Sequence, residues 1–177
     1  MDLYKNGFVV AEMNSKNGLY NAWPLSNLSG DKVAESLTDE ADDNWFIKYE
    51  MQHIVPDLNY VKIYHDYCNR INLQTEVLLF ESLDNSITIN NALNVTEVIG
   101  FDCIGTVYYS YLQNEYEDFK SEFLEKKICL NKYGLLDSFE DVLYFIKLRK
   151  KVIASGVNLE DFWRELPVKI SIVDITK

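Results

Sequence analysis

Residues 71–119 contain eight acidic side chains and no Lys, Arg or His. Carboxylates in such a stretch cannot form ion pairs with one another. Some of them can pair with cations of the basic last third of the chain, and the others project a negative field into solvent. The first outcome ties this stretch to other segments of the fold, and the second produces a negative surface. The eight acids are Glu76, Glu81, Asp84, Glu97, Asp102, Glu115, Glu117 and Asp118.

The charge of the whole chain is distributed in the same uneven way. Residues 1–60 carry 10 acidic and 4 basic side chains, residues 61–118 carry 9 and 2, and residues 119–177 carry 9 and 11. The acidic two thirds can pair with the basic third, attract a cationic partner, or form a solvated surface that favours solubility. The net charge of −11 excludes a generic nucleic-acid binder and argues against an anionic membrane surface as partner.

Composition predicts a globular protein, because 47% of the 177 residues are apolar and 14% are aromatic. This length suits one domain over residues 1–177 with no disulfide or metal. The start of the chain has no secretory signal, and no uncharged apolar run approaches the roughly 18 residues of a membrane span. Three cysteines without close spacing suit a reducing compartment, so we expect a cytoplasmic protein without membrane contact.

The pattern of apolar residues predicts both strands and helices. Short apolar or alternating runs predict strands at residues 7–13, 19–23, 44–50, 76–81, 86–90, 97–103 and 106–112. Residues 31–37 suit a short helix, and Asp57 can cap a helix that continues to Arg70.

In the last third of the chain, helix ends are marked by charge and capping residues. Asn114 can cap a helix over residues 115–127, whose ends carry acids and then lysines. Ser138 and Asp141 form a box-like start for a second helix that Gly156 ends, and residues 167–175 alternate as a closing strand. The elements predict an α+β fold, mostly an antiparallel sheet with about three helices packed on it, or an irregular α/β sandwich.

No Gly-rich phosphate loop, nucleophile elbow, zincin or EF-hand motif occurs in the sequence. His65 and Cys68 lie three residues apart on a predicted helix, but a zinc site would need two further ligands. The basic run Lys147–Lys151 sits at a helix C-terminus, where dipole complementarity explains it. We therefore expect no enzyme activity, no catalytic residue, no metal and no cofactor.

Tyrosines and acids gather inside the cation-free stretch. Tyrosine is enriched at protein interfaces, and nearby carboxylates suit a partner rich in Arg and Lys. Strand geometry would place Tyr109 and Tyr111 on one face and Tyr108 on the other, so part of the group could equally serve the core. The residues predicted to contact a partner are Asp102, Tyr109, Tyr111, Glu115, Tyr116, Glu117 and Asp118.

Several short motifs resemble those of bacterial immunity proteins, which are encoded beside polymorphic toxins, including those of contact-dependent growth inhibition. The resemblance covers about the last 80 residues. It rests on Gly100-Phe101-Asp102, Asn131, Tyr133-Gly134-Leu135-Leu136 and Glu140-Asp141, followed by a closing strand.

The resemblance implies a cytoplasmic toxin inhibitor that takes part in bacterial competition. Such a protein binds a cognate C-terminal toxin domain and neutralises it stoichiometrically. Many such toxins are nucleases, for example tRNases or other RNases, and hold phosphates with cationic surfaces, which suits an acidic inhibitor. The alternatives are an acidic mimic of nucleic acid that inhibits host or phage nucleases, a small enzyme centred on Cys103 or His65, or an adaptor.

Overall fold

A computed structural model describes residues 7–13, 20–21, 57–70, 72, 75–82, 93–105, 110–156 and 165–176. The strands are β1 (Gly7–Met13), β2 (Tyr20–Asn21), β3 (Thr75–Ser82), β4 (Asn94–Ile104) and β5 (Leu166–Asp174). The helices are α3 (Leu58–Arg70), α4 (Tyr111–Glu115), α5 (Lys120–Glu125) and α6 (Phe139–Ala154), with a 3₁₀ helix η2 (Tyr116–Phe119) between α4 and α5. None of these helices is both long and apolar enough to span a bilayer.

The described strands form one sheet in the order β2-β1-β3-β5-β4, and every neighbouring pair is antiparallel. β5 comes last in the chain but lies between β3 and β4. β4 is therefore an edge strand, and two irregularities interrupt its pairing with β5 near Thr96 and Ile99.

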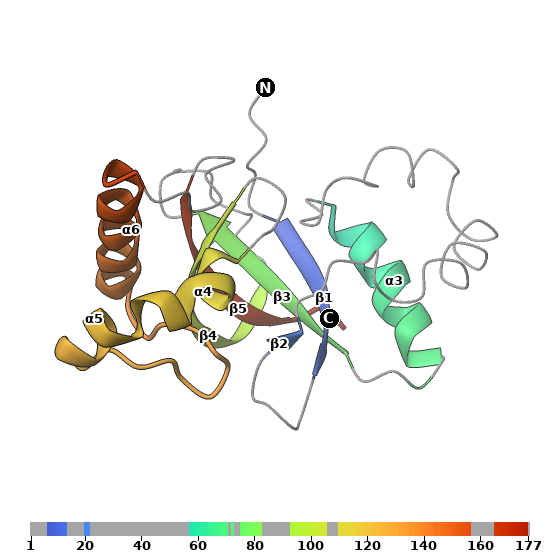
Figure 1. Ribbon diagram of the computed structural model, residues 1–177. Coiled ribbons are helices and arrows are strands. Elements are labelled where there is room, and N and C mark those ends of the chain that lie inside the picture. Colours follow the sequence, from blue (N-terminus) through green and yellow to red (C-terminus); the bar gives the residue numbers. More distant parts are fainter. Residues whose placement is uncertain are drawn as a thin grey trace.

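Helices flank both ends of this sheet (Figure 1). α3 contacts β1 and β3, whereas α4 and α6 contact the β4 and β5 end. The predicted α+β class, with helices packed on an antiparallel sheet, is confirmed.

The described core has two apolar clusters, one on each side of β4. One cluster joins sheet residues such as Phe80, Ile104 and Ile170 to Leu135. The other joins Cys103 to the aromatic residues of η2, α5 and α6, where Phe119 and Phe123 contact Phe145. The second cluster fixes α4, η2 and α5 against α6.

The predicted strands at 7–13, 19–23, 76–81, 97–103 and 167–175 are confirmed within a few residues. The predicted cap of α3 is also confirmed, because the Asn59 amide donates to Asp57 Oδ1 at 2.9 Å. The strands predicted at 44–50 and 86–90 and the helix predicted at 31–37 lie outside the described residues.

Two predictions around residue 111 are wrong. Tyr111 and Leu112 do not continue a strand but begin α4, while residues 106–109 lie outside the described part of the chain. The single helix predicted from Asn114 to Lys127 is instead the series α4, η2 and α5. The 3₁₀ turn brings side chains three residues apart into line, and this places Tyr116 and Phe119 on the side that packs with Phe123.

α6 follows its sequence signals closely. The Asp141 amide donates to Ser138 Oγ at 3.1 Å, and the Ser138 hydroxyl donates to Asp141 Oδ2 at 2.8 Å. The helix ends at Ala154, and Gly156 follows with φ +84°. The box-like start and the glycine stop are both confirmed.

Candidate functional site

Two of the segments singled out in the sequence, residues 100–102 and 131–136, meet at the edge of the sheet. Leu136 pairs with Phe101 through two backbone bonds, of 2.9 Å from the Phe101 amide and 3.1 Å from the Leu136 amide. The segment 131–136 therefore lies against the edge of β4 that is not paired with β5. Residues about 30 positions apart in the sequence thus form one unit.

The Asn131 side chain organises this unit. Its Nδ2 donates to the Ile99 carbonyl at 2.9 Å, and its Oδ1 accepts from the amides of Tyr133 and Leu135 at 2.9 and 3.2 Å. Nδ2 also donates to Asp137 Oδ1 at 3.0 Å. The amide group thus satisfies backbone groups of both β4 and the loop, which is a structural role.

Gly100 is required where the loop crosses β4. Its φ of +146° disfavours other residues, and an added Cβ would lie 2.7 Å from Leu135 Cβ and 2.8 Å from the Leu136 carbonyl oxygen. The glycine of the first motif therefore makes room for the leucines of the second.

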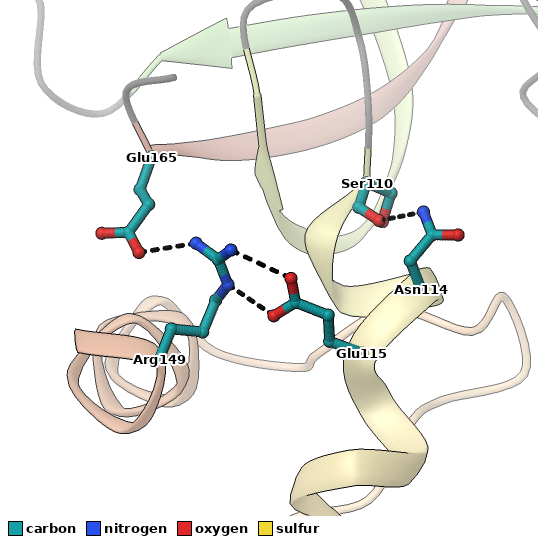
Figure 2. A network of polar contacts seen from close by, with 5 residues as sticks. All are labelled: Ser110, Asn114, Glu115, Arg149 and Glu165. Carbon is teal, nitrogen blue, oxygen red and sulfur yellow. Dashed lines mark hydrogen bonds and ion pairs between the residues drawn. The ribbon is translucent and has the colours of Figure 1, made fainter. Parts of the chain in front are cut away.

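A charged cluster lies in the interior behind α4. Arg149 on α6 is only 1% exposed, and Figure 2 shows its guanidinium between the carboxylates of Glu115 and Glu165. Nε and Nη2 bind Glu115 at 2.5 and 2.9 Å, and Nη1 binds Glu165 at 2.6 Å. The cluster joins α4, α6 and the residue that precedes β5.

Tyr111 completes the surroundings of Arg149. Its ring lies under the guanidinium, with Cζ 3.8 Å from the ring centroid. Burial raises the pKa of the Tyr111 phenol, and the charge of Arg149 opposes this shift. The helix-dipole explanation of the run 147–151 is thus wrong for Arg149, because its side chain points into the protein rather than toward solvent.

Asp102 is a second buried acid, on the strand beside this cluster. It is 1% exposed; its Oδ1 accepts from the Cys103 amide at 2.6 Å, and its Oδ2 has no hydrogen-bond partner among the described residues. Burial raises the pKa of Asp102 from 3.8 to about 7, and hydrogen bonds from Ser110 and the Cys103 backbone oppose the shift.

Three of the residues predicted to contact a partner are therefore interior. Asp102, Tyr111 and Glu115 have little accessible surface, and Glu115 is held by Arg149. Tyr109 lies outside the described residues. Glu117 and Asp118 are exposed and Tyr116 is half-buried, so these three remain available at the surface of η2.

Tyr116 belongs to a row of aromatic rings that joins η2 to α6. Its ring stacks on Phe123 at 5.4 Å, and Phe123 in turn lies 6.4 Å from Tyr144 between ring centroids. Tyr116 and Tyr144 are half-buried, while Phe123 is fully buried. Tyr116, a half-buried member of this row, directly precedes the acids Glu117 and Asp118 in the sequence.

Half of the acids in the cation-free stretch are paired by the last third of the chain. The cations are Lys120, Lys132, Arg149 and Lys169, which bind Glu117, Glu97, Glu115 and Glu81 respectively. Pairing with the basic third is therefore the outcome for these four. Asp84 lies outside the described residues.

The candidate centres for an enzyme differ in accessibility. Cys103 is fully buried, and burial, with the Asp102 charge second, raises the pKa of its thiol, which disfavours the thiolate. His65 is half-buried, with Nε2 3.4 Å from the Thr75 carbonyl oxygen, and Cys68 on the same helix is buried. Within the described ranges, no three His, Cys, Asp or Glu residues are grouped to hold a metal ion.

Comparison of the chain with protein-family models, curated proteins and solved structures finds no match. The function must therefore be argued from the residues themselves. The role of Glu165 and the interior position of Arg149 were not predicted from the sequence. An arginine at a buried helical position, in phase with Val142, Phe145 and Ile146, was the available signal.

Proposed function

We propose that this protein is an immunity-type inhibitor that binds a cationic toxin domain stoichiometrically and without catalysis. The observation that carries the proposal is the concentration of acid in residues 1–118, which hold 19 acidic and 6 basic side chains. Such a chain attracts a cationic surface and repels nucleic acid. A nuclease has a cationic surface of this kind, because it must hold phosphates.

The surface that best suits this role is the acidic turn, which we define as Tyr116, Glu117 and Asp118 on η2. The side chain of Glu117 is 74% exposed, and it bonds only to Lys120, another exposed residue, in the described region. The row of aromatic rings keeps Tyr116 against Phe123, so the turn is attached to α6 rather than free to fold back. A rigid tyrosine beside carboxylates can bind Arg or Lys through both charge and ring contacts.

The direct test is co-expression with the protein encoded immediately upstream, which this proposal expects to carry the toxin domain. We expect survival of the host and co-purification of the two proteins in a fixed ratio. Death of the host together with failure to co-purify would refute the proposal.

The surface can be tested with a pair of charge-reversal variants. Glu117→Lys should slow association and weaken its dependence on salt, because the steering field is reduced. The matched control is Asp66→Lys on α3, an exposed acid at the other end of the sheet. If the association rate falls equally in the test variant and in Asp66→Lys, the partner responds to net charge and not to the acidic turn.

The nucleic-acid mimic remains the second candidate, because the same acidity would serve it. A mimic should inhibit several unrelated DNA- or RNA-binding enzymes, whereas an immunity-type inhibitor should protect against one. A competition panel of non-cognate nucleases separates these outcomes.

A further inference from the structure

β4 begins with five consecutive exposed residues, from Asn94 to Val98. The β5 residues that pair with this half of β4 are buried or half-buried. Val95 and Val98 are 44% and 52% exposed, and they are two of the four large apolar side chains that lie in solvent in the described region. A single exposed apolar residue needs no explanation, whereas two on one strand form a small apolar surface.

The irregular pairing of β4 places these two valines on one side of the sheet. Val95 pairs with Val173 and Val98 pairs with Ser171, and residues two apart on β5 point to the same side. A regular strand would instead direct residues three apart to opposite sides. The extra residue near Thr96 therefore brings Val95 and Val98 onto a common face, and bulges at sheet edges often redirect a side chain in this way.

The same face of β4 continues into the core. Phe101 pairs with Lys169, two positions from Ser171 on β5, so its side chain lies on the side of the two valines. Phe101 also packs against the apolar cluster of η2, α5 and α6. Val95 and Val98 thus continue an apolar row from the core to the exposed end of β4. We call these two residues the edge strip.

The outer edge of β4 is covered over its C-terminal half. Leu136 bonds to Phe101, and the Asn131 side chain bonds to the Ile99 carbonyl, so the loop covers the edge from residue 99 onward. Among the described residues, no backbone group outside β5 and the adjoining residue 93 bonds to the backbone of residues 94–98. A strand edge of this kind can accept a further strand.

The side chains along residues 94–98 carry almost no net charge. Glu97 is the single charged residue of this segment; the Tyr133 hydroxyl donates to it at 2.9 Å, and Lys132 Nζ lies 3.7 Å from it. Edges that resist pairing usually carry lysine or proline, and neither occurs between residues 94 and 98. A cationic strand would meet Lys132 here, so the edge suits an uncharged, β-branched strand.

We propose that the edge strip is a self-association surface, at which a second copy of this chain adds its own β4 in antiparallel orientation. A two-fold axis between Thr96 and Glu97 sets Val95 opposite Val98 of the second copy, so the apolar residues of both copies meet on one face. The same register sets Glu97 opposite Thr96 and keeps the two glutamates from pairing directly. The loop on the other half of the edge limits the ladder, so the dimer is weak.

The net charge of the chain sets the sign of the salt dependence. Two copies that each carry −11 repel one another, and added salt screens this repulsion. Self-association at the edge strip should therefore strengthen as salt rises. Binding of a cationic partner at the acidic turn should instead weaken with salt, so the two contacts are distinguishable.

The test is sedimentation of the full chain over a concentration series at about 0.05 and 0.5 M NaCl. We expect a monomer–dimer equilibrium whose dissociation constant falls several-fold at the higher salt concentration. Val98→Lys places a charge on the edge strip and should abolish dimerisation. Leu143→Lys is the matched control, because Leu143 is 46% exposed on α6 and the substitution changes the net charge equally. A monomer throughout, a dimer that salt weakens, or equal loss in both variants would overturn the proposal.

A milder change and a local readout keep the proposal testable if Val98→Lys does not fold. Val95→Thr combined with Val98→Thr retains the β-branched shape but removes the apolar contact, so the dissociation constant should rise on the order of tenfold. Hydrogen exchange within residues 94–98 should slow as the concentration of the wild-type protein rises, while exchange in the loop 131–136 changes little. Protection that arises elsewhere and not in β4 would overturn the proposal.

Self-association does not depend on the proposed function, because it needs no toxin domain. A dimer in a wild-type protein that fails to co-purify with the protein encoded upstream would reject the proposed function alone. If the wild type stays monomeric and Val98→Lys prevents that co-purification, the edge strip binds the upstream protein, and self-association is rejected.

Discussion

The β4 end of the sheet is held by two polar hubs of opposite kind. One is the charged cluster of Arg149, Glu115 and Glu165, which joins side chains from three elements. The other is the neutral amide of Asn131, which bonds mainly to backbone groups of β4 and its own loop. The side chains of the charged hub therefore depend on one another, whereas the neutral hub bonds to backbone groups, which no substitution can remove.

The largest effect is expected from removing one member of the charged hub. Arg149→Met leaves the buried Glu115 carboxylate without its cation and leaves Glu165 with only the exposed Lys150, so we expect a loss of about 3–5 kcal/mol in the free energy of unfolding. Denaturant unfolding measures this loss. Lys150→Met is the matched control, because Lys150 is exposed and lies 3.5 Å from Glu165. Similar stability of the two variants would show that the buried charge does not need Arg149.

The charged hub can also be removed as a whole. Replacing Arg149 by Met and both glutamates by Leu eliminates every unpaired charge, and we expect most of the lost stability to return. The comparison with Arg149→Met in the same unfolding assay is the measurement. If the triple variant is less stable than Arg149→Met, the three side chains stabilise the fold by more than neutralising one another's buried charge.

A substitution at Gly100, where the loop of the neutral hub contacts β4, should destabilise the protein nearly as much. Gly100→Ala places a methyl group against Leu135 and Leu136 in a backbone region that disfavours it, so we expect a loss of about 2–5 kcal/mol. Gly156→Ala is the matched control, since Gly156 also has a positive φ but has nothing within 4 Å of the added Cβ. Thermal unfolding of both variants should show the larger loss at Gly100.

A smaller loss is expected at Asn131 itself. Asn131→Leu keeps the volume but leaves the Ile99 carbonyl and two loop amides without their partner, which should cost about 2–3 kcal/mol. No apolar replacement at a neighbouring position should restore this loss, in contrast to the charged hub. Recovery of stability in an Asn131→Leu variant with further apolar changes would contradict the distinction between the hubs.

The smallest effect is expected at the exposed pair of Glu117 and Lys120. Both side chains lie largely in solvent, so Glu117→Gln should leave stability unchanged within the error of denaturant unfolding. Glu115→Gln, two residues away and buried, should be clearly destabilising in the same assay. Equal losses of stability in Glu117→Gln and Glu115→Gln would contradict the expected difference between surface and interior acids.

Local signals predicted the elements that depend on local interactions. The box at Ser138 and Asp141, the glycine at 156 and the alternation before residue 175 identified α6 and β5, because capping bonds and strand periodicity act within a few residues. The α+β class followed from the same signals. The helices between residues 111 and 127 could not be predicted, since packing of their aromatic rings on α6 selected short helices over one long helix.

The candidate site was predictable only in part, for the same reason. The acids and tyrosines near residue 116 were identified as a group, but the sequence does not show that Glu115 is directed toward Arg149 and Glu117 toward solvent. Likewise, the motif at Asn131 was noted, whereas its bond to Ile99 spans 32 positions and depends on the completed sheet. Contacts of this kind arise from the tertiary fold and have no local pattern.

The position of β5 has a consequence for the time at which this fold can form during synthesis. β5 is translated after all other described strands, yet it lies between β3 and β4 in the sheet. While the ribosome is still adding residues 139–165, β4 lacks β5, the strand with which it forms its ladder in the described sheet. The β4 edge and the β1–β3 ribbon can therefore unite only when residues 166–174 have left the ribosomal tunnel.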